Sequence, residues 1–169
     1  MSSVRLVAVC AADAPTSKTR TLVETIVAER GGELIDLSSL PAEGLLGRTE
    51  DEAVARAVAK AGDAQVLVVA TPVYRASYTG ALKAFFDRFQ YEALKGTAVV
   101  LVATAAAAEH YLALDTGGRA LIASLGGLTV PTVVYATHDD FVDGRPTDEL
   151  LVKLRTAVDE AEALAAKSH

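Results

Sequence analysis

The chain has 169 residues, of which 51% are hydrophobic and 22% are charged, and its formal net charge is −6. This length allows one domain with a sizeable core, and the composition is that of a globular rather than a disordered protein. The negative charge and the lack of a long basic run argue against a nucleic-acid-binding surface.

The amino-terminal segment has no basic region followed by the apolar core of a signal peptide, and no apolar run approaches the roughly 20 residues that span a bilayer. A soluble cytoplasmic protein is therefore expected. The only cysteine, Cys10, rules out an internal disulfide. Because Cys10 lies in an apolar run, we expect a buried small side chain rather than a nucleophile.

Apolar runs of strand length alternate along the chain with stretches of helical periodicity. The predicted strands are 4–10, 34–37, 66–70, 97–103 and 128–136, the last of them interrupted by Pro131. Helices are predicted at 17–30, 50–61 and 147–167, from the end of the loop 71–80 as far as Phe89, and within 104–125. In the last helix, the face expected to be buried contains Leu151, Leu154, Val158, Ala161 and Ala165.

This alternation predicts an α/β fold, because such units build an open parallel sheet with helices on both faces. Right-handed crossovers between five strands favour the flavodoxin-like three-layer αβα arrangement, with strand order 2-1-3-4-5. The chain shows no internal repeat or linker, so we expect one domain over 1–169. Ligands of such sheets bind beyond the carboxyl ends of the central strands, which here lead into the loops 11–16, 71–80 and 104–110.

The first of these loops leads into the helix 17–30 and carries hydroxyl and basic side chains. The free N–H groups and the dipole at a helix amino terminus attract anions, and Ser17, Lys18 and Thr19 add hydroxyl groups and positive charge there. The segment therefore fits a phosphate dianion. Plain helix capping by Thr16 or Ser17 is the simpler explanation of the same residues.

The second loop, 71–80, combines two tyrosines, an arginine and three hydroxyl residues. Such a loop offers flat apolar surface and hydrogen bonds to a planar polar ligand, although an ordinary surface loop can have the same composition. The segment 71–83, TPVYRASYTGALK, resembles the signature loop of the NADPH-dependent FMN reductases, and the similarity continues through 85–87. These reductases are flavodoxin-like proteins, and the subgroup most similar to this segment supplies reduced flavin to two-component monooxygenases.

The resemblance implies that FMN lies against this loop with its ring and ribityl chain. Pro72 is expected to fix the turn. Val73, Tyr74 and Arg75 are expected to face the flavin and to offer their backbone N–H groups to it. An alternative role for Arg75 is contact with the phosphate of NADPH or with the negative charge of reduced flavin.

The same resemblance assigns Ser17, Lys18 and Thr19 to the flavin phosphate. They match the second half of the family's phosphate loop, whereas the segment 11–13, Ala-Ala-Asp, replaces its Gly-Ser-Pro. The carboxylate of Asp13 then either points to solvent or weakens FMN binding.

In the third loop, Thr104 and His110 match a family segment that ends in histidine, and the resemblance places both beside the flavin. Ala105 and Ala106 stand where the family has glycines, which reshapes the ring site because alanine takes positive φ only at a cost. His110 is either a helix-start residue, the favoured interpretation, or an acid or base. After Asp115, where two-component members often carry an aromatic or other inserted residue, this chain has Thr116-Gly117-Gly118.

No metal site and no separate dinucleotide site are expected. His138, Asp139, Asp140 and Asp143 are of metal-ligand type, but their spacing fits no established motif. The GxGxxG fingerprint of a dinucleotide site is absent from the sequence, so the nicotinamide nucleotide is expected to bind over the flavin.

The resulting hypothesis is an NAD(P)H-dependent FMN reductase, in which NADPH or NADH delivers hydride to FMN. That step needs no acid or base, so no catalytic residue is assigned. The resemblance also implies a homodimer or homotetramer and a flavin-dependent monooxygenase as partner. Three alternatives stay open: a flavodoxin-like binding module that has weakened or lost FMN, an electron carrier of the flavodoxin type, and an FMN-bound quinone or azo reductase.

Overall fold

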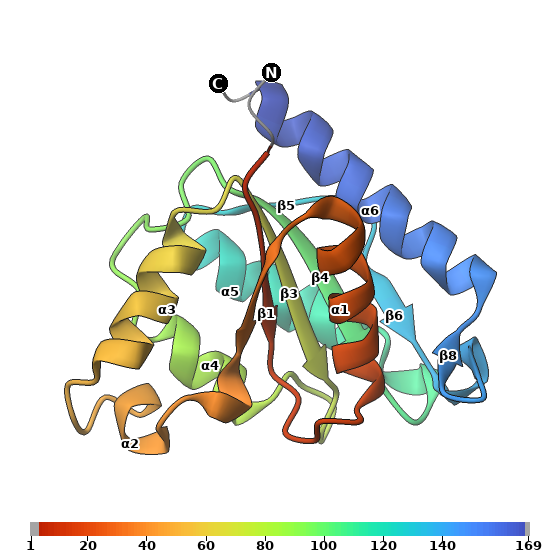
Figure 1. Ribbon diagram of the computed structural model, residues 1–169, viewed down its shortest axis with the longest axis horizontal. Coiled ribbons are helices and arrows are strands. Elements are labelled where there is room, and N and C mark those ends of the chain that lie inside the picture. Colours follow the sequence, from red (N-terminus) through yellow and green to blue (C-terminus); the bar gives the residue numbers. More distant parts are fainter. Residues whose placement is uncertain (1–3, 168–169) are drawn as a thin grey trace.

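The fold is built around a parallel six-stranded sheet, seen in a computed structural model that describes residues 4–167. The strand order is β2-β1-β3-β4-β5, and β6 also pairs with β4 (Figure 1). This order confirms the predicted flavodoxin-like αβα architecture. The strands are β1 (Leu6–Cys10), β2 (Glu33–Asp36), β3 (Val66–Pro72), β4 (Ala98–Thr104), β5 (Leu128–Thr129) and β6 (Val134–Ala136).

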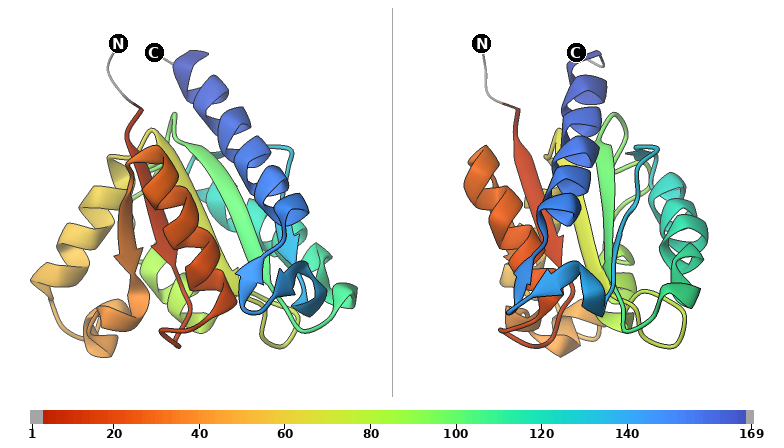
Figure 2. Two further views of the ribbon diagram at one scale, coloured as in Figure 1. Left: turned by 45° about the vertical axis from the view of Figure 1, so that its right-hand side comes forward. Right: turned by 90° about the vertical axis from the view of Figure 1, so that its right-hand side faces the viewer.

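Helices cover both faces of this sheet (Figure 2). The α-helices are α1 (Lys18–Arg30), α2 (Ala42–Leu45), α3 (Glu52–Gly62), α4 (Gly80–Phe86), α5 (Arg119–Ser124) and α6 (Asp148–Lys167). Helices α1 and α6 pack on alternate residues of the strands, such as Ala8, Val68 and Val100. Helices α3, α4 and α5 pack on the intervening residues, such as Val9 and Leu67. Because both faces are covered, β1, β3 and β4 are buried along their whole length, as their continuous apolar runs predicted.

The predicted fifth strand, 128–136, is in fact two short strands that pair with different parts of β4. Between them lies Pro131, which has no N–H to give to the ladder. The guanidinium of Arg119 donates to the carbonyl oxygens of Val130 and Pro131, each at 2.8 Å. The backbone N–H of Thr132 donates to Glu160 Oε2 at 3.1 Å. The backbone that leaves the ladder is therefore satisfied by side chains of two helices.

Several predicted boundaries were wrong where short turns occur. The predicted loop 38–49 contains the end of η1 (Leu37–Ser39) and the short helix α2. The predicted loop 137–146 contains η4 (His138–Asp140) and a hairpin of β7 (Phe141–Val142) and β8 (Arg145–Pro146). The segment 104–125 is divided into η2 (Ala108–His110), the π-helical turn η3 (Leu114–Gly118) and α5. These short turns are closed by local hydrogen bonds. The spacing of apolar residues, from which the boundaries were predicted, does not reveal such bonds.

The first residue of the buried face of α6 was predicted wrongly by one position. Leu150 is buried, whereas Leu151 is half-buried. Leu150 lies one turn before Leu154 on the stripe that packs against the sheet, so the helix presents it to the core. The rest of the predicted face, Leu154, Val158, Ala161 and Ala165, is buried.

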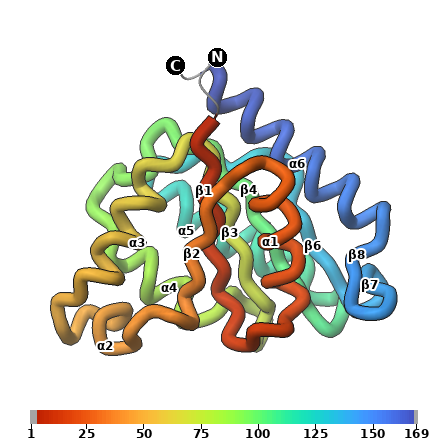
Figure 3. The backbone as a smooth tube through the Cα atoms, in the orientation of Figure 1, coloured from red at the N-terminus to blue at the C-terminus, as the bar shows by residue number. Residues whose placement is uncertain are grey.

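The core is closed by three aromatic rings in and after α4. The ring centroids of Phe85, Phe86 and Phe89 lie 5.2 to 5.5 Å apart. Cys10 is fully buried, as predicted. The chain enters β1 and leaves α6 at the same edge of the sheet, opposite the loops that follow β1 and β3 (Figure 3). Among the described residues, no helix is both long enough and apolar enough to cross a membrane.

Candidate functional site

The loops that follow β1, β3 and β4 meet at one edge of the sheet (Figure 1). Direct backbone hydrogen bonds join the strand ends there: Ala11 N–H donates to Ala70 O at 2.9 Å, and Val73 N–H donates to Thr104 O at 2.8 Å. The predicted site residues thus come from segments that the parallel pairing holds side by side. We call this region, made of 11–19, 71–80 and 104–110, the loop edge.

The amino terminus of α1 combines a cap with unused backbone donors. Ser17 is the N-cap, and its side-chain oxygen accepts from the N–H of Arg20 at 3.1 Å. The N–H groups of Lys18 and Thr19 belong to the first turn, where a helix has no acceptor of its own to offer. Capping by Ser17 is therefore observed, and it leaves room for an anion at the same helix end.

The side chain of Lys18 is directed to the neighbouring hairpin of β7 and β8. Its Nζ lies 2.6 Å from His138 Nδ1 and 4.9 Å from the ring centroid of Phe141. The lysine donates to the imidazole in this arrangement, because an ammonium group has no acceptor. The sequence analysis missed His138 as a companion of Lys18, since 120 positions separate the two residues.

The side chains of Thr19 and Thr104 are brought together in the interior. Their hydroxyl oxygens lie 2.6 Å apart, and their exposed fractions are 0% and 8%. This buried bond ties α1 to the end of β4. The Thr19 hydroxyl, predicted to face a phosphate, is directed inward, which leaves the backbone N–H as its contribution to the helix end.

The start of loop two is held by threonine side chains rather than by a turn at Pro72. Pro72 is the last residue of β3 and is buried opposite Thr104, so the prediction that it fixes the turn was wrong. The Thr71 hydroxyl accepts from Thr79 N–H at 3.1 Å, and the Thr79 hydroxyl donates to Ala11 O at 3.4 Å. Loop two is thereby fastened to loop one at its base.

The tip of loop two is a tight two-residue turn. Tyr74 and Ser77 form an antiparallel bridge with backbone hydrogen bonds of 3.0 and 3.2 Å. Between them, Arg75 and Ala76 have φ angles of 52° and 60°. Two consecutive non-glycine residues in the left-handed region carry a conformational cost, and such strain concentrates at functional sites. The turn also uses the Tyr74 N–H, and Val73 N–H is bonded to Thr104, so neither is the free donor that was predicted.

The side chain of Tyr74 connects the first two loops. Its hydroxyl donates to Asp13 Oδ1 at 3.3 Å, although the residue as a whole is 54% exposed. Partial burial and the adjacent Asp13 carboxylate raise the pKa of Tyr74 above its ordinary value. The carboxylate predicted to point to solvent or to disturb an anion site is thus held at the mouth of the loop edge.

Loop three is anchored at its beginning and exposed at its end. Ala105 N–H donates to Ala136 O at 2.9 Å, and the Tyr135 hydroxyl donates to Ala107 O at 2.6 Å. Burial, followed by the charge of Glu109, raises the pKa of Tyr135. His110 is exposed and ends the turn η2, two residues before the helical segment that begins at Leu112.

The π-helical turn η3 packs against loop two at Gly117 and is closely packed on its inner side at Gly118. A Cβ atom at Gly117 would lie 3.3 Å from the ring of the half-buried Tyr78. A Cβ atom at Gly118 would lie 3.1 Å from Leu114. The Thr116 hydroxyl donates to Leu112 O at 2.8 Å across the widened turn. The missing side chain of Gly117 therefore fits the close approach of Tyr78.

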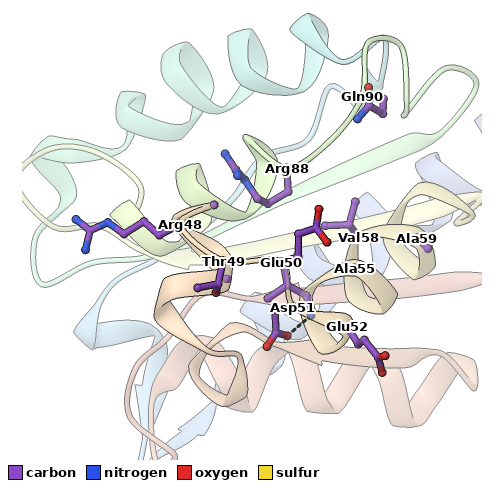
Figure 4. Close-up of a pocket in the computed structure, with 13 residues that line it drawn as sticks. Arg48, Thr49, Glu50, Asp51, Glu52, Ala55, Val58, Ala59, Arg88 and Gln90 are labelled. Carbon is purple, nitrogen blue, oxygen red and sulfur yellow. Dashed lines mark hydrogen bonds between the residues drawn. The ribbon is translucent and has the colours of Figure 1, made fainter.

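A separate hollow of the described residues lies away from the loop edge. A groove of about 880 Å³ lies between α2, α3 and the segment after α4, and none of its lining residues belongs to the loop edge (Figure 4). Its walls include Val58 of α3 and Arg88. Among residues 4–167, no group of three or more histidine, cysteine, aspartate or glutamate side chains is arranged to hold a metal ion.

Comparison with known proteins gives consistent matches over most of the chain. Residues 4–141 match the family model of NADPH-dependent FMN reductase. An NADH-dependent FMN reductase of Pseudomonas fluorescens is 38% identical over 158 residues, which cover 88% of this chain and 84% of that protein. An FMN reductase (NADPH) of Pseudomonas aeruginosa is 35% identical over 173 residues, which cover 96% of this chain and 93% of that protein.

Two solved structures are similar at comparable identity. The apo form of an NADH:FMN oxidoreductase has a TM-score of 0.85 and 32% identity, and the match covers 95% of this chain and 89% of that one. An oxidoreductase from Corynebacterium diphtheriae has a TM-score of 0.83 and 33% identity, with 98% and 99% covered. These matches agree with the resemblance that the segment 71–83 shows by itself.

Proposed function

The chain belongs to the NADPH-dependent FMN reductase family, and we propose that the loop edge binds FMN for reduction by a nicotinamide nucleotide. The observation that carries this proposal is the convergence of the family's signature loop, 71–80, with the amino terminus of α1 at the carboxyl edge of the sheet. That edge is where ligands bind in sheets of this topology.

The groups present at α1 fit the phosphate of FMN. The helix has 13 residues, its first N–H groups have no intrahelical acceptors, and its positive dipole end faces the loop edge. Ser17, Lys18 and Thr19 would hold the phosphate, chiefly through backbone N–H groups. The two threonines at 19 and 104 would keep the helix end in place through their buried bond.

Loop two fits the remainder of the flavin. Val73, Tyr74 and Arg75 would lie along the ring and ribityl chain, with the strained turn at 75–76 setting their direction. Thr104 and His110 of loop three would lie on the other side of the same site. When bound, FMN supplies a ring that accepts hydride, and this chain's own residues orient that ring and leave one face open to the nicotinamide.

The electron donor, the partner and the oligomeric state are proposed from the resemblance to the family. The donor is NADH or NADPH, bound over the flavin. Reduced FMN leaves to serve a separate flavin-dependent monooxygenase, and the active form is a homodimer or homotetramer in the cytoplasm. A quinone or azo reductase that retains FMN, and a binding module that has lost it, are the outcomes against which the proposal is tested.

The test is a titration of the purified apoprotein with FMN, followed by anaerobic addition of NADPH or NADH. Saturable quenching of flavin fluorescence and then bleaching of the oxidised-flavin absorbance are expected. Replacing Arg75 by alanine should weaken nucleotide or flavin binding about tenfold, the size of one charge-assisted hydrogen bond. Arg56→Ala, which removes another exposed arginine, from α3, should have no effect. Absence of flavin binding by the unmodified protein would contradict the proposal.

A further inference from the structure

Asp13 is an acidic group fixed at the mouth of the anion site. It lies in the loop that leads into α1, is exposed, and accepts the hydroxyl hydrogen of Tyr74 at 3.3 Å. Tyr74 in turn is held by the bridge to Ser77 and by the positive-φ turn. The carboxylate is therefore attached to both sides of the opening between loop one and loop two.

The basic side chains nearest in the chain are already occupied. Lys18 Nζ is bonded to His138 Nδ1 at 2.6 Å. The guanidinium of Arg20 is bonded to Asp36 Oδ2 at 2.7 Å. A phosphate dianion at the end of α1 would thus meet the backbone N–H groups and the charge of Lys18, opposed by the negative charge of Asp13, which precedes the N-cap Ser17 in the same loop. Like charges oppose binding, and at an exposed carboxylate such as Asp13 water and salt reduce the effect without removing it.

We propose that Asp13 is a specificity-determining residue that weakens the contribution of the flavin phosphate to binding, with Tyr74 as the residue that positions it. This inference rests on the proposed function and adds to it the class of ligand. The protein therefore distinguishes little between FMN and the phosphate-free flavin, riboflavin.

The first experiment compares dissociation constants for FMN and riboflavin, measured by fluorescence quenching at fixed ionic strength. Asp13→Asn should tighten FMN binding about fivefold, the size of one partly screened charge, and leave riboflavin unchanged. The control is Asp63→Asn, which makes the same charge change at an exposed residue after α3, before the start of β3. It should alter neither constant.

The second experiment uses Tyr74→Phe, which removes the hydroxyl that holds the carboxylate. The ratio of the two dissociation constants should shift toward FMN when Asp13 is present and stay constant in the Asp13→Asn background. The ratio cancels any change in ring contact that both flavins share. Equal effects of Asp13→Asn on both flavins, or none, would overturn the inference while the proposed function stands. Failure of the unmodified protein to bind either flavin would overturn both.

Discussion

The loop edge and the groove beside α3 differ in how their polar groups are used. At the loop edge, hydroxyl, carboxylate and backbone groups from distant segments bond to one another, as Thr19 does to Thr104 and Tyr74 to Asp13. In the groove, Asp51 is committed to capping α3, accepting from the N–H groups of Ala53 and Val54 at 2.9 and 3.0 Å. The groove is thus a space between helix surfaces, whereas the loop edge is where polar groups from distant segments converge.

Arg88 illustrates the character of the groove. Its Nε is buried, and within the described part of the chain it has no hydrogen-bond partner. Its guanidinium packs over Gly47, whose φ of 69° and missing Cβ leave the space for it. The side chain of Arg88 therefore packs as part of the groove wall. Volume alone is a poor guide to the site in this fold, and strand ends are a better one.

The largest effect is expected from Phe85→Ala, which removes a fully buried ring from α4, the helix that connects loop two to the segment lining the groove. Loss of this ring should lower the free energy of unfolding by about 3–5 kcal/mol, because the cavity cannot be refilled by its neighbours. Denaturant unfolding measures it. Val152→Ala, at a side chain 60% exposed on α6, is the control and should change little. A loss as small as the control's would show that α4 does not support the two regions.

The next effect is expected at Asp36, which joins the end of β2 to α1. Burial by itself would raise the pKa of Asp36, but hydrogen bonds from Ser38 and the guanidinium of Arg20 outweigh it and hold the pKa below its ordinary value. Asp36→Asn should therefore cost about 1.5–3 kcal/mol at neutral pH, the range for a hydrogen bond to a charged group.

This contribution has a definite pH dependence. A carboxylate with a lowered pKa stabilises the fold above the pKa of the unfolded chain, and the stabilisation is lost as the pH falls through the folded value. The stability difference between the original protein and Asp36→Asn should thus shrink below about pH 4. Glu24→Gln, 3.9 Å from the same arginine and 56% exposed, should show little difference at any pH. A constant difference for Asp36→Asn would contradict the assignment.

A smaller effect is expected from Thr104→Val, which keeps the volume but leaves the buried Thr19 hydroxyl without its partner. The cost should be about 1–2 kcal/mol, the penalty for an unsatisfied buried group. The double variant Thr19→Val with Thr104→Val should recover part of this loss, because no orphaned hydroxyl remains. Strictly additive losses would show that the two side chains do not act as a pair.

The smallest effect is expected from relieving the strained turn. Ala76→Gly should stabilise the protein by up to about 1 kcal/mol, because glycine accepts a φ of 60° without the steric cost that alanine has. Glu92→Gly, at a φ of 53° away from the loop edge, should stabilise it similarly. Only Ala76→Gly should change flavin affinity. An equal change in flavin affinity in both variants would show that the strain at 75–76 has no specific role in flavin binding.

The sequence predicted the sheet better than it predicted the site. Continuous apolar runs such as 66–70 and 98–103 indicate strands buried on two faces, and strand ends then locate the loop edge. The contacts of that edge were not predictable, because they join residues far apart in the sequence: Thr19 and Thr104 inside it are 85 positions apart, and Lys18 lies 120 positions from its outside partner His138. No local pattern marks such pairs. Pro72 was predicted to lie in a turn because proline is common in turns, and the sequence does not distinguish a turn from the buried end of a strand.

The burial of the Cys10 thiol affects how readily the protein is oxidised by peroxide formed from reduced flavin. Reduced flavin released into air-saturated solution reacts with oxygen and forms peroxide, which oxidises thiolates rather than thiols. Burial raises the pKa of Cys10, and its exposed fraction is 0%. The only thiol of the chain is therefore both protonated and shielded, so turnover in air should leave it unmodified for as long as the sheet stays folded.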